Sequence, residues 1–196
     1  MMPEPRDRHL THEEIGELLD AAQLPPIRLF LILAITTASR KTALLDLQWP
    51  RIDFERGLIH LYDPERERTS KGRALVPMNA SARAALLEAR TGAVTDYVIE
   101  WAGRPVADVK RGAATAFEKS NLEVRDDGAH VLRHTAAVLM AEDGVSIPEI
   151  AQYLGHSDLR TTFRTYARFS PEYLKKAANS LELPAVHLRV SDRRWR

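Results

Sequence analysis

The segment IRLFLILAITTA (residues 27–38) constrains the fold of this chain more than any other part of its sequence. Wound into a helix it is apolar nearly all round, and a helix of that kind has to be buried among other elements. Pro25 and Pro26 precede it, where prolines end one helix and suit the first turn of the next. The run is interrupted by Arg28 and falls short of the roughly 20 residues that a membrane span needs. We therefore predict a central helix in a globular domain.

Composition narrows the class of protein. The chain has 196 residues, of which 44% are hydrophobic and 28% charged, as expected for one globular domain. It has no cysteine, which excludes disulfides, thiolate nucleophiles and most structural zinc sites. A net charge of +1 excludes a histone-like polycation but leaves room for a local basic face that binds nucleic acid. The first residues contain no apolar signal region, so we expect a cytoplasmic protein without a membrane segment.

Apolar spacing and capping residues predict further elements. Thr11 with Glu14, and Ser146 with Glu149, form capping boxes that begin two helices. Extended segments flank a turn at Arg56-Gly57, and RALVPM (73–78) adds another strand. We expect further helices from near Arg40 and over 79–90, 106–120, 130–142, 147–154, 158–166 and 171–181, and a small strand over 97–101. The predicted fold class is α+β, mostly α-helical, with a small three-stranded antiparallel sheet.

The stretch HVLRH (130–134) crowds titratable groups onto the first turn of a predicted helix. His130, Arg133 and His134 are spaced i, i+3 and i+4, so they share one face. Positive charge opposes the helix dipole at this end, whereas an anion is favoured there. A zinc site and a purely structural role are the alternatives, and the zinc reading lacks the glutamate of an HExxH motif. The pattern favours an anion site.

A second stretch, LGHSDLRTTFRTYARF (154–169), supplies another histidine and a tyrosine. Together with TTASRKTALLDLQW (36–49), a hairpin lysine and HVLR, it resembles the catalytic domain of the tyrosine recombinases, or phage integrases. The motifs occur in the family's order, and the resemblance extends from about His9 to Ala177. It implies a tyrosine-recombinase-type fold and the breaking and rejoining of double-stranded DNA.

The resemblance also implies roles for individual residues. Arg40 and Arg133 would grip the scissile phosphate, and His130 and His156 would contact the phosphate and handle protons. A guanidinium suits this task because its planar donors match phosphate oxygens. No metal or other cofactor is implied.

The remaining chemistry falls to a lysine and a tyrosine. Lys71, in the charged tip DPERERTSKG (63–72), would be the general acid. Tyr166 would attack phosphorus and form a 3′-phosphotyrosine, releasing a 5′-hydroxyl. Tyr153 and Tyr173 are poor substitutes, because neither follows LGH at a suitable distance.

Three features depart from the family pattern. Ala43 stands where an acidic residue usually supports the first arginine, and Asp46 at i+6 faces elsewhere on the helix. The tyrosine follows His156 by ten residues instead of nine, so we expect the path to it to differ from a regular helix. Lys71 also lies closer to Val76 and Pro77 than in many relatives.

The expected organisation is a catalytic domain over residues 1–181 and a C-terminal tail over 182–196, without the N-terminal core-binding domain of full-length relatives. Those relatives assemble as tetramers on DNA, and we expect the isolated domain to be a monomer or weak dimer. The resulting hypothesis is a prophage-type integrase that carries out site-specific recombination. Two alternatives stay open: a catalytically silent DNA-binding or assembly module on the same fold, and a DNA-relaxing enzyme like the type IB topoisomerases.

Overall fold

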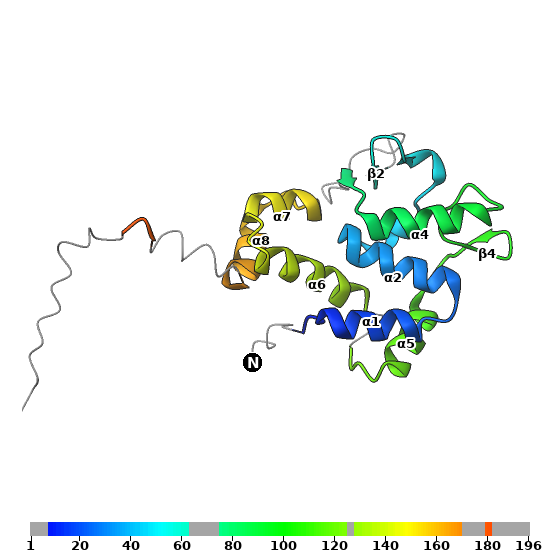
Figure 1. Cartoon of the computed structure of the whole chain (residues 1–196), viewed down its shortest axis with the longest axis horizontal. Coiled ribbons are helices and arrows are strands. Elements are labelled where there is room, and N and C mark those ends of the chain that lie inside the picture. Colours follow the sequence, from blue (N-terminus) through cyan, green and yellow to red (C-terminus); the bar gives the residue numbers. More distant parts are fainter. Residues whose placement is uncertain (1–7, 63–74, 125–127, 170–178, 182–196) are drawn as a thin grey trace, which may run out of the picture.

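A computed structural model describes residues 8–62, 75–124, 128–169 and 179–181. Figure 1 shows an elongated body in which helices outnumber strands and α6 joins a larger group of elements to a smaller one. In chain order the described elements are α1 (His12–Ala21), α2 (Pro25–Thr37), α3 (Lys41–Leu45), the 3₁₀ turn η1 (Trp49–Arg51), β1 (Ile52–Asp53), β2 (Leu58–His60), β3 (Leu75–Pro77), α4 (Ala80–Thr91), β4 (Glu100–Trp101), β5 (Arg104–Pro105), α5 (Lys110–Lys119), α6 (Ala129–Glu142), α7 (Ile147–Leu154), α8 (Leu159–Tyr166) and the 3₁₀ turn η2 (Ala167–Phe169). The predicted α+β class is confirmed.

Helix α2 is the central helix that its apolar sequence predicts. It packs against α1, α4, α5 and α6, and Phe30, Leu31 and Leu33 are fully buried. Arg28 lies at the exposed side, where its guanidinium donates to the carbonyl of Leu19. An all-round apolar helix is stable only when neighbours cover every face, and here those neighbours come from both halves of the chain.

The two predicted capping boxes are also confirmed. The Thr11 hydroxyl accepts from the amide of Glu14 while the Glu14 carboxylate accepts from the amide of Thr11, and Ser146 and Glu149 repeat this arrangement at α7. Each capping box satisfies amides that the first helical turn leaves without partners.

The three-stranded sheet is antiparallel with the order β1-β2-β3. Ile59 pairs with Ile52 on one side and Val76 on the other, and its side chain is buried in the main core. Gly57 takes a φ of +66° in the turn between β1 and β2, as the sequence predicts. The charged tip with Lys71 lies outside the described residues.

Two predicted elements differ from the structure. The segment 97–101 forms only the short strand β4, which pairs with β5 in a hairpin that the sequence did not indicate. Ala102 and Gly103 both have positive φ in its two-residue turn, and alanine gives no signal for that conformation. Helix α5 begins at Lys110, not Val106, because the Val106 amide donates to Ile99 in the hairpin.

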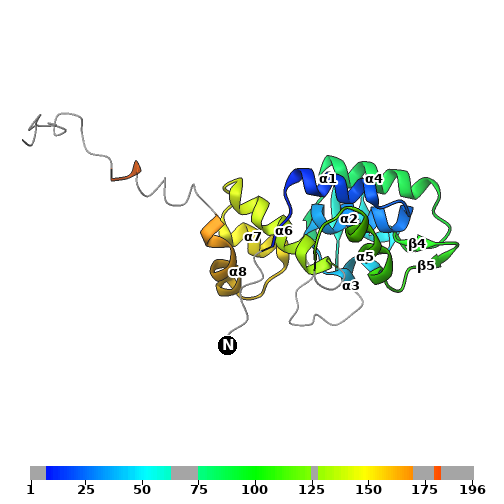
Figure 2. The same cartoon turned by 90° about the horizontal axis from the view of Figure 1, so that it is seen from below.

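Helix α6 spans two apolar cores. Leu132 belongs to the main core with α2 and the sheet, whereas Ala136, Ala137 and Ala141 line a second core with α7 and α8. In Figure 2 α7 and α8 lie together at one end of the body and the elements of the main core at the other. Arg133 therefore lies where the two cores meet.

Gly128 immediately precedes α6 and is held against the main core. Its φ is +67°, and a methyl group there would come within 2.0 Å of the Phe117 ring. Gly57 has a similar φ of +66° with nothing within 4 Å, so Gly57→Ala measures the backbone cost alone.

We expect Gly57→Ala to cost about 1 kcal/mol, the penalty of a left-handed conformation. Gly128→Ala should cost about 1–3 kcal/mol more, because the methyl group overpacks a buried ring. Denaturant unfolding of both variants measures the difference. Equal losses would mean that the Phe117 ring moves aside without strain.

Candidate active site

The Arg133 side chain is fixed by two helix ends. Its guanidinium donates to the carbonyl of Ala38 at 2.5 Å and to that of Leu154 at 2.7 Å. Ala38 caps the C-terminus of α2, and Leu154 is the last residue of α7. Carbonyls at helix C-termini lack intrahelical partners and carry partial negative charge, so they hold a cation well.

Arg40 is brought beside Arg133 by the turn that follows α2. Ala38 takes a left-handed conformation with a φ of 50°, and the hydroxyl of Thr37 hydrogen-bonds that of Ser39 at 2.7 Å within the buried turn. Arg40 then caps α3. Burial, and secondarily repulsion from Arg40, lower the pKa of Arg133 to about 10, so the Arg133 guanidinium remains a cation at neutral pH. Paired guanidiniums form an anion site.

His156 joins this pair from the end of α7. Gly155, with a φ of 64°, ends the helix, and His156 follows two residues after Leu154. Its Nδ1 lies 2.8 Å from the hydroxyl oxygen of Thr162, a fully buried residue of α8. Burial, Arg133 and Arg40 together lower the pKa of His156 to about 4. The imidazole is therefore neutral at pH 7 and able to accept a proton.

Tyr166 is the last residue of α8 and faces the interior. Its side chain is 7% exposed, and its ring stacks on that of His134 with centroids 5.4 Å apart. Burial raises the pKa of the phenol, and the charge of Arg133 opposes that rise. The phenol is thus protonated at neutral pH, with a cation close enough to favour its anion.

The other described tyrosines are engaged elsewhere. The Tyr153 hydroxyl donates to the carbonyl of Thr36 at 2.7 Å, and burial raises its pKa. Tyr97 pairs with Gln48 in a β-bridge, and Tyr62 follows β2. Tyr173 lies outside the described residues.

The other two predicted site residues are His130 and Lys71. His130 lies in the first turn of α6 with its side chain exposed, and Lys71 is outside the described residues. The helical face expected for His130, Arg133 and His134 is divided, because His134 is 6% exposed and turns into the second core. The structure therefore brings together Arg40, Arg133, His156 and Tyr166.

The departures from the family pattern have simple structural outcomes. Ala43 is buried, and Asp46 lies 3.8 Å from Arg51, to which it forms an ion pair. The extra residue before Tyr166 does not distort α8, which is a regular helix from Leu159 to Tyr166. The expected departure from a regular helix lies between α7 and α8, where Ser157 and Asp158 precede the first helical residue of α8.

Sequence reasoning missed Thr162 and the two carbonyls that bind Arg133. Thr162 precedes Tyr166 by four residues, so both lie on the inner face of α8. That spacing is a usable signal. The carbonyls of Ala38 and Leu154 gave no signal in the sequence, because every residue carries the same backbone group.

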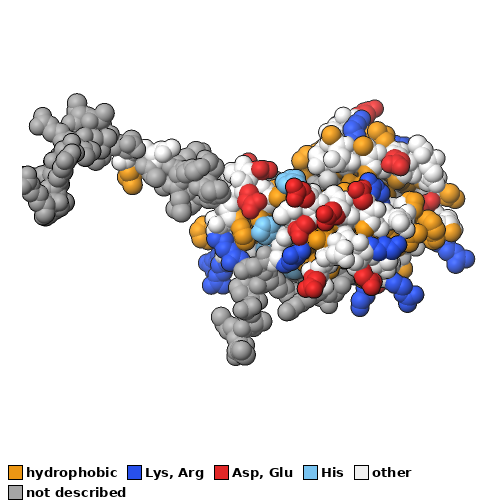
Figure 3. Space-filling view, turned by 60° about the horizontal axis from the view of Figure 1, so that its bottom comes forward, with side chains coloured by type: hydrophobic (Ala, Val, Ile, Leu, Met, Phe, Trp, Pro, Cys, Tyr) orange, Lys and Arg blue, Asp and Glu red, His pale blue; other side chains and the backbone are white. Residues whose placement is uncertain are grey.

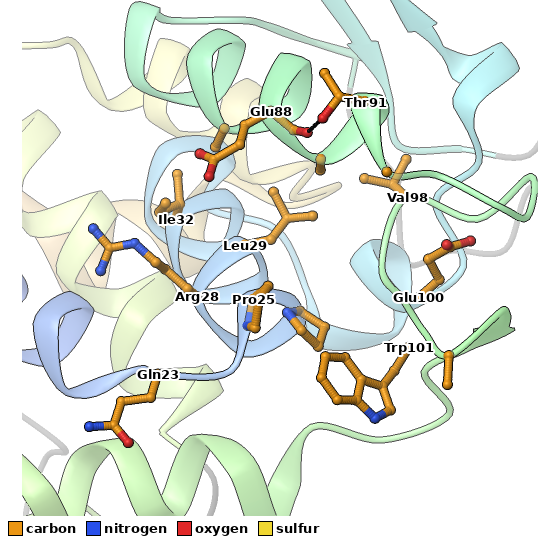
Figure 4. Close-up of a pocket in the computed structure, with 15 residues that line it drawn as sticks. Gln23, Pro25, Arg28, Leu29, Ile32, Glu88, Thr91, Val98, Glu100 and Trp101 are labelled. Atoms are coloured by element: carbon orange, nitrogen blue, oxygen red, sulfur yellow. Dashed lines mark hydrogen bonds between the residues drawn. The ribbon is translucent and has the colours of Figure 1, made fainter.

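A separate hollow of about 510 Å³ lies near the start of α2, between that helix, α4 and β4. Figure 4 shows Leu29, Ile32 and Val98 on its walls with Trp101 at one edge. The Glu100 carboxylate accepts from the amides of Val94 and Thr95 and so has a structural task. Of the predicted site residues that the structure describes, none lines this hollow.

Charge is mixed on the surface seen in Figure 3, where acidic side chains lie among lysines and arginines.

Within the described ranges, no three histidine, aspartate or glutamate side chains gather in a way that would hold a metal ion. Among the described helices, none has the length and apolar character to cross a membrane.

The low pKa of His156 can be tested directly. In Arg40→Gln a neighbouring cation is lost, so the pKa of His156 should rise above about 4 toward the ordinary 6.5. NMR titration of the ring measures it, with Arg164→Gln, on the exposed side of α8, as the matched control.

The pKa shift also fixes the sign of a stability effect. Between pH 6.5 and about 4 the unfolded chain binds more protons at this histidine than the folded chain. His156 therefore lowers the free energy of unfolding progressively as the pH falls through that window.

In the NMR titration, an unchanged His156 pKa in Arg40→Gln would contradict the placement of His156 near Arg40.

The sequence matches the phage integrase family over residues 8–172. It is 31% identical to tyrosine recombinase XerA of Thermococcus onnurineus over 93% of this chain and 65% of that protein. It is 33% identical to tyrosine recombinase XerC of Lactobacillus delbrueckii subsp. bulgaricus over 75% of this chain and 52% of that protein. The chain thus spans about half to two thirds of the length of these relatives.

Solved structures share the fold. The Tn1549 transposon integrase in complex with circular intermediate DNA superposes with a TM-score of 0.76 at 18% identity, over 92% of this chain and 69% of that one. The catalytic domain of bacteriophage HP1 integrase gives a TM-score of 0.66 at 22% identity, over 87% of this chain and 93% of that one. The order of the sequence motifs, the fold and the family match agree, and the chain belongs to the phage integrase family.

Proposed function

We propose that this chain is the catalytic part of a site-specific recombinase that cuts and rejoins double-stranded DNA through a 3′-phosphotyrosine. One observation carries the proposal: the buried phenol of Tyr166 lies within electrostatic range of Arg133, whose guanidinium is fixed beside Arg40. A tyrosine hydroxyl next to an anion site is an arrangement that suits phosphoryl transfer to tyrosine.

The reaction assigns a task to each group. A DNA phosphate lies against Arg40 and Arg133, and the Tyr166 oxygen attacks phosphorus. The phenol proton passes to a neutral acceptor, and we assign this task to His156, whose imidazole is neutral at pH 7. Its pKa of about 4 makes it a weak base in the free protein, and the negative charge of a phosphate bound beside it would raise that pKa. The bond from phosphorus to the 5′-oxygen breaks, and Lys71 supplies the proton that makes the 5′-hydroxyl. Rejoining reverses these steps. The phosphotyrosine conserves the energy of the broken phosphodiester bond, so no cofactor is needed.

His130 completes the proposed phosphate site from the first turn of α6. It lies one helical turn before Arg133, and its exposed ring is open to a DNA backbone. A helix N-terminus also favours the phosphate charge.

Double-stranded DNA is the proposed partner. The structural relatives include a XerH recombinase bound to its difH substrate and the Tn1549 integrase bound to circular intermediate DNA. We also propose that the protein associates with further copies of itself on DNA. This stays a proposal because the chain spans only part of the length of its relatives. A net charge of +1 means that DNA binding depends on local groups and not on the overall charge.

Tyr166→Phe tests the nucleophile. The change removes one oxygen and keeps the ring, so packing and DNA affinity should be nearly unchanged while the covalent adduct disappears. Protein incubated with sheared DNA is denatured, and covalently attached fragments are captured and sequenced, so the cleavage site need not be known beforehand. Tyr153→Phe is the matched control, because it also removes one tyrosine hydroxyl, which donates to the carbonyl of Thr36, and should still form the adduct.

The adduct assay, together with a relaxation assay on supercoiled plasmid, distinguishes the proposed function from its two alternatives. An adduct formed by Tyr166→Phe would show that another residue is the nucleophile. No adduct from the parent chain would favour the silent DNA-binding module. Relaxation of supercoiled plasmid without joining of two sites would favour the topoisomerase-like alternative.

Lys71→Ala tests the general acid. It should slow cleavage by about 10²–10⁴-fold, the usual worth of a positioned proton donor. A substrate with sulfur in place of the 5′-bridging oxygen needs no protonation of its leaving group, so it should restore the rate. If the defect is as large on the sulfur substrate, Lys71 positions the DNA instead.

A further inference from the structure

The ring of His134, on α6, packs against the Tyr166 ring, and Phe169 packs against that histidine. The His134 ring is tilted by 36° against the Tyr166 ring at a centroid distance of 5.4 Å. The same histidine meets the edge of Phe169 at 6.3 Å and 78°. His134 lies on α6, the helix that carries Arg133, and Phe169 lies in η2, directly after the helix that carries Tyr166.

His134 is placed by the turn of helix that also places Arg133. Consecutive residues of a helix point about 100° apart, so Arg133 reaches the carbonyls of Ala38 and Leu154 while His134 enters the second core. One turn of α6 thereby sets the position of the guanidinium and of the ring against which Tyr166 packs.

Phe169 holds the chain just after the tyrosine. It follows Tyr166 by three residues in the 3₁₀ turn η2, and such residues lie on the same side. His9, from the segment that precedes α1, meets the Phe169 ring at 5.6 Å and 74°. The Phe169 ring is therefore held by α6 and by the start of the chain.

We propose that His134 and Phe169 are positioning residues for Tyr166, acting through ring packing. This rests on the proposed function, in which Tyr166 is the nucleophile. A phenol that attacks in line with the leaving oxygen must be held within a fraction of an ångström, and a misplacement of about 1 Å costs on the order of 100-fold in rate. Rings packed at fixed angles limit rotation of the tyrosine without hydrogen-bonding its hydroxyl.

The first experiment measures adduct formation under single-turnover conditions, beside DNA affinity and unfolding. His134→Ala and Phe169→Ala should each slow the adduct by about 10- to 100-fold with little change in Kd. His134→Phe keeps a flat ring and should restore most of the rate. Val138→Ala, a buried truncation one turn further along α6, controls for general loosening and should not slow the reaction.

Two outcomes would overturn the proposal. If His134→Phe is as slow as His134→Ala, the histidine acts through its nitrogens and not through packing. If Val138→Ala slows the adduct as much as His134→Ala at equal loss of stability, the effect is not specific to the ring.

A second measurement does not depend on activity. N-acetylimidazole acetylates accessible phenols, and mass spectrometry gives the extent at each tyrosine. Tyr166 should be protected in the parent and become reactive in His134→Ala, with Tyr153 unchanged. Unchanged protection of Tyr166 would refute the positioning role even if the parent forms an adduct. A parent without any adduct would defeat the proposed function while this measurement still decides the packing.

Discussion

The two hydrogen bonds of the Arg133 guanidinium are the interaction on which the rest of the site depends. They join the C-terminal ends of α2 and α7 to α6, and so connect the main core to the second core. Arg40 follows Ala38 by two residues, and His156 follows Leu154 by two. The carbonyls that fix one guanidinium therefore also fix where two other site residues leave their helices. A guanidinium has five donors, so bonds remain for a phosphate.

The second consequence of this arrangement is electrostatic. The guanidiniums of Arg40 and Arg133 suppress the charged form of His156, while Arg133 favours the charged form of Tyr166. Within the described residues, no carboxylate contributes to the pKa shift of Arg133 or His156. Main-chain carbonyls orient Arg133 without neutralising it, and its charge stays available for the negative charge that develops during phosphoryl transfer.

Small residues permit the close approach of these helix ends. Ala38 packs in the second core with Ala137 and Ala141 of α6, and all three are fully buried. Alanine at these places leaves room for the Arg133 side chain to cross between backbones, where larger side chains would separate α2 from α6. Ala38 also accepts a left-handed conformation that costs roughly 1–2 kcal/mol, which the surrounding contacts offset.

Among the described residues, the sequence by itself determined the helices apart from the start of α5, the two capping boxes, the three-stranded sheet and the order of the motifs, because periodicity and caps act over a few residues. It also indicated which residue types serve phosphoryl transfer. Only the tertiary structure decided that His130 stays exposed while His134 turns inward, that Ala102 enters a hairpin turn, and that Arg133 bonds the carbonyl of Ala38. The last contact joins residues 95 positions apart. Such choices depend on how distant elements pack, and no local pattern of residues contains that information.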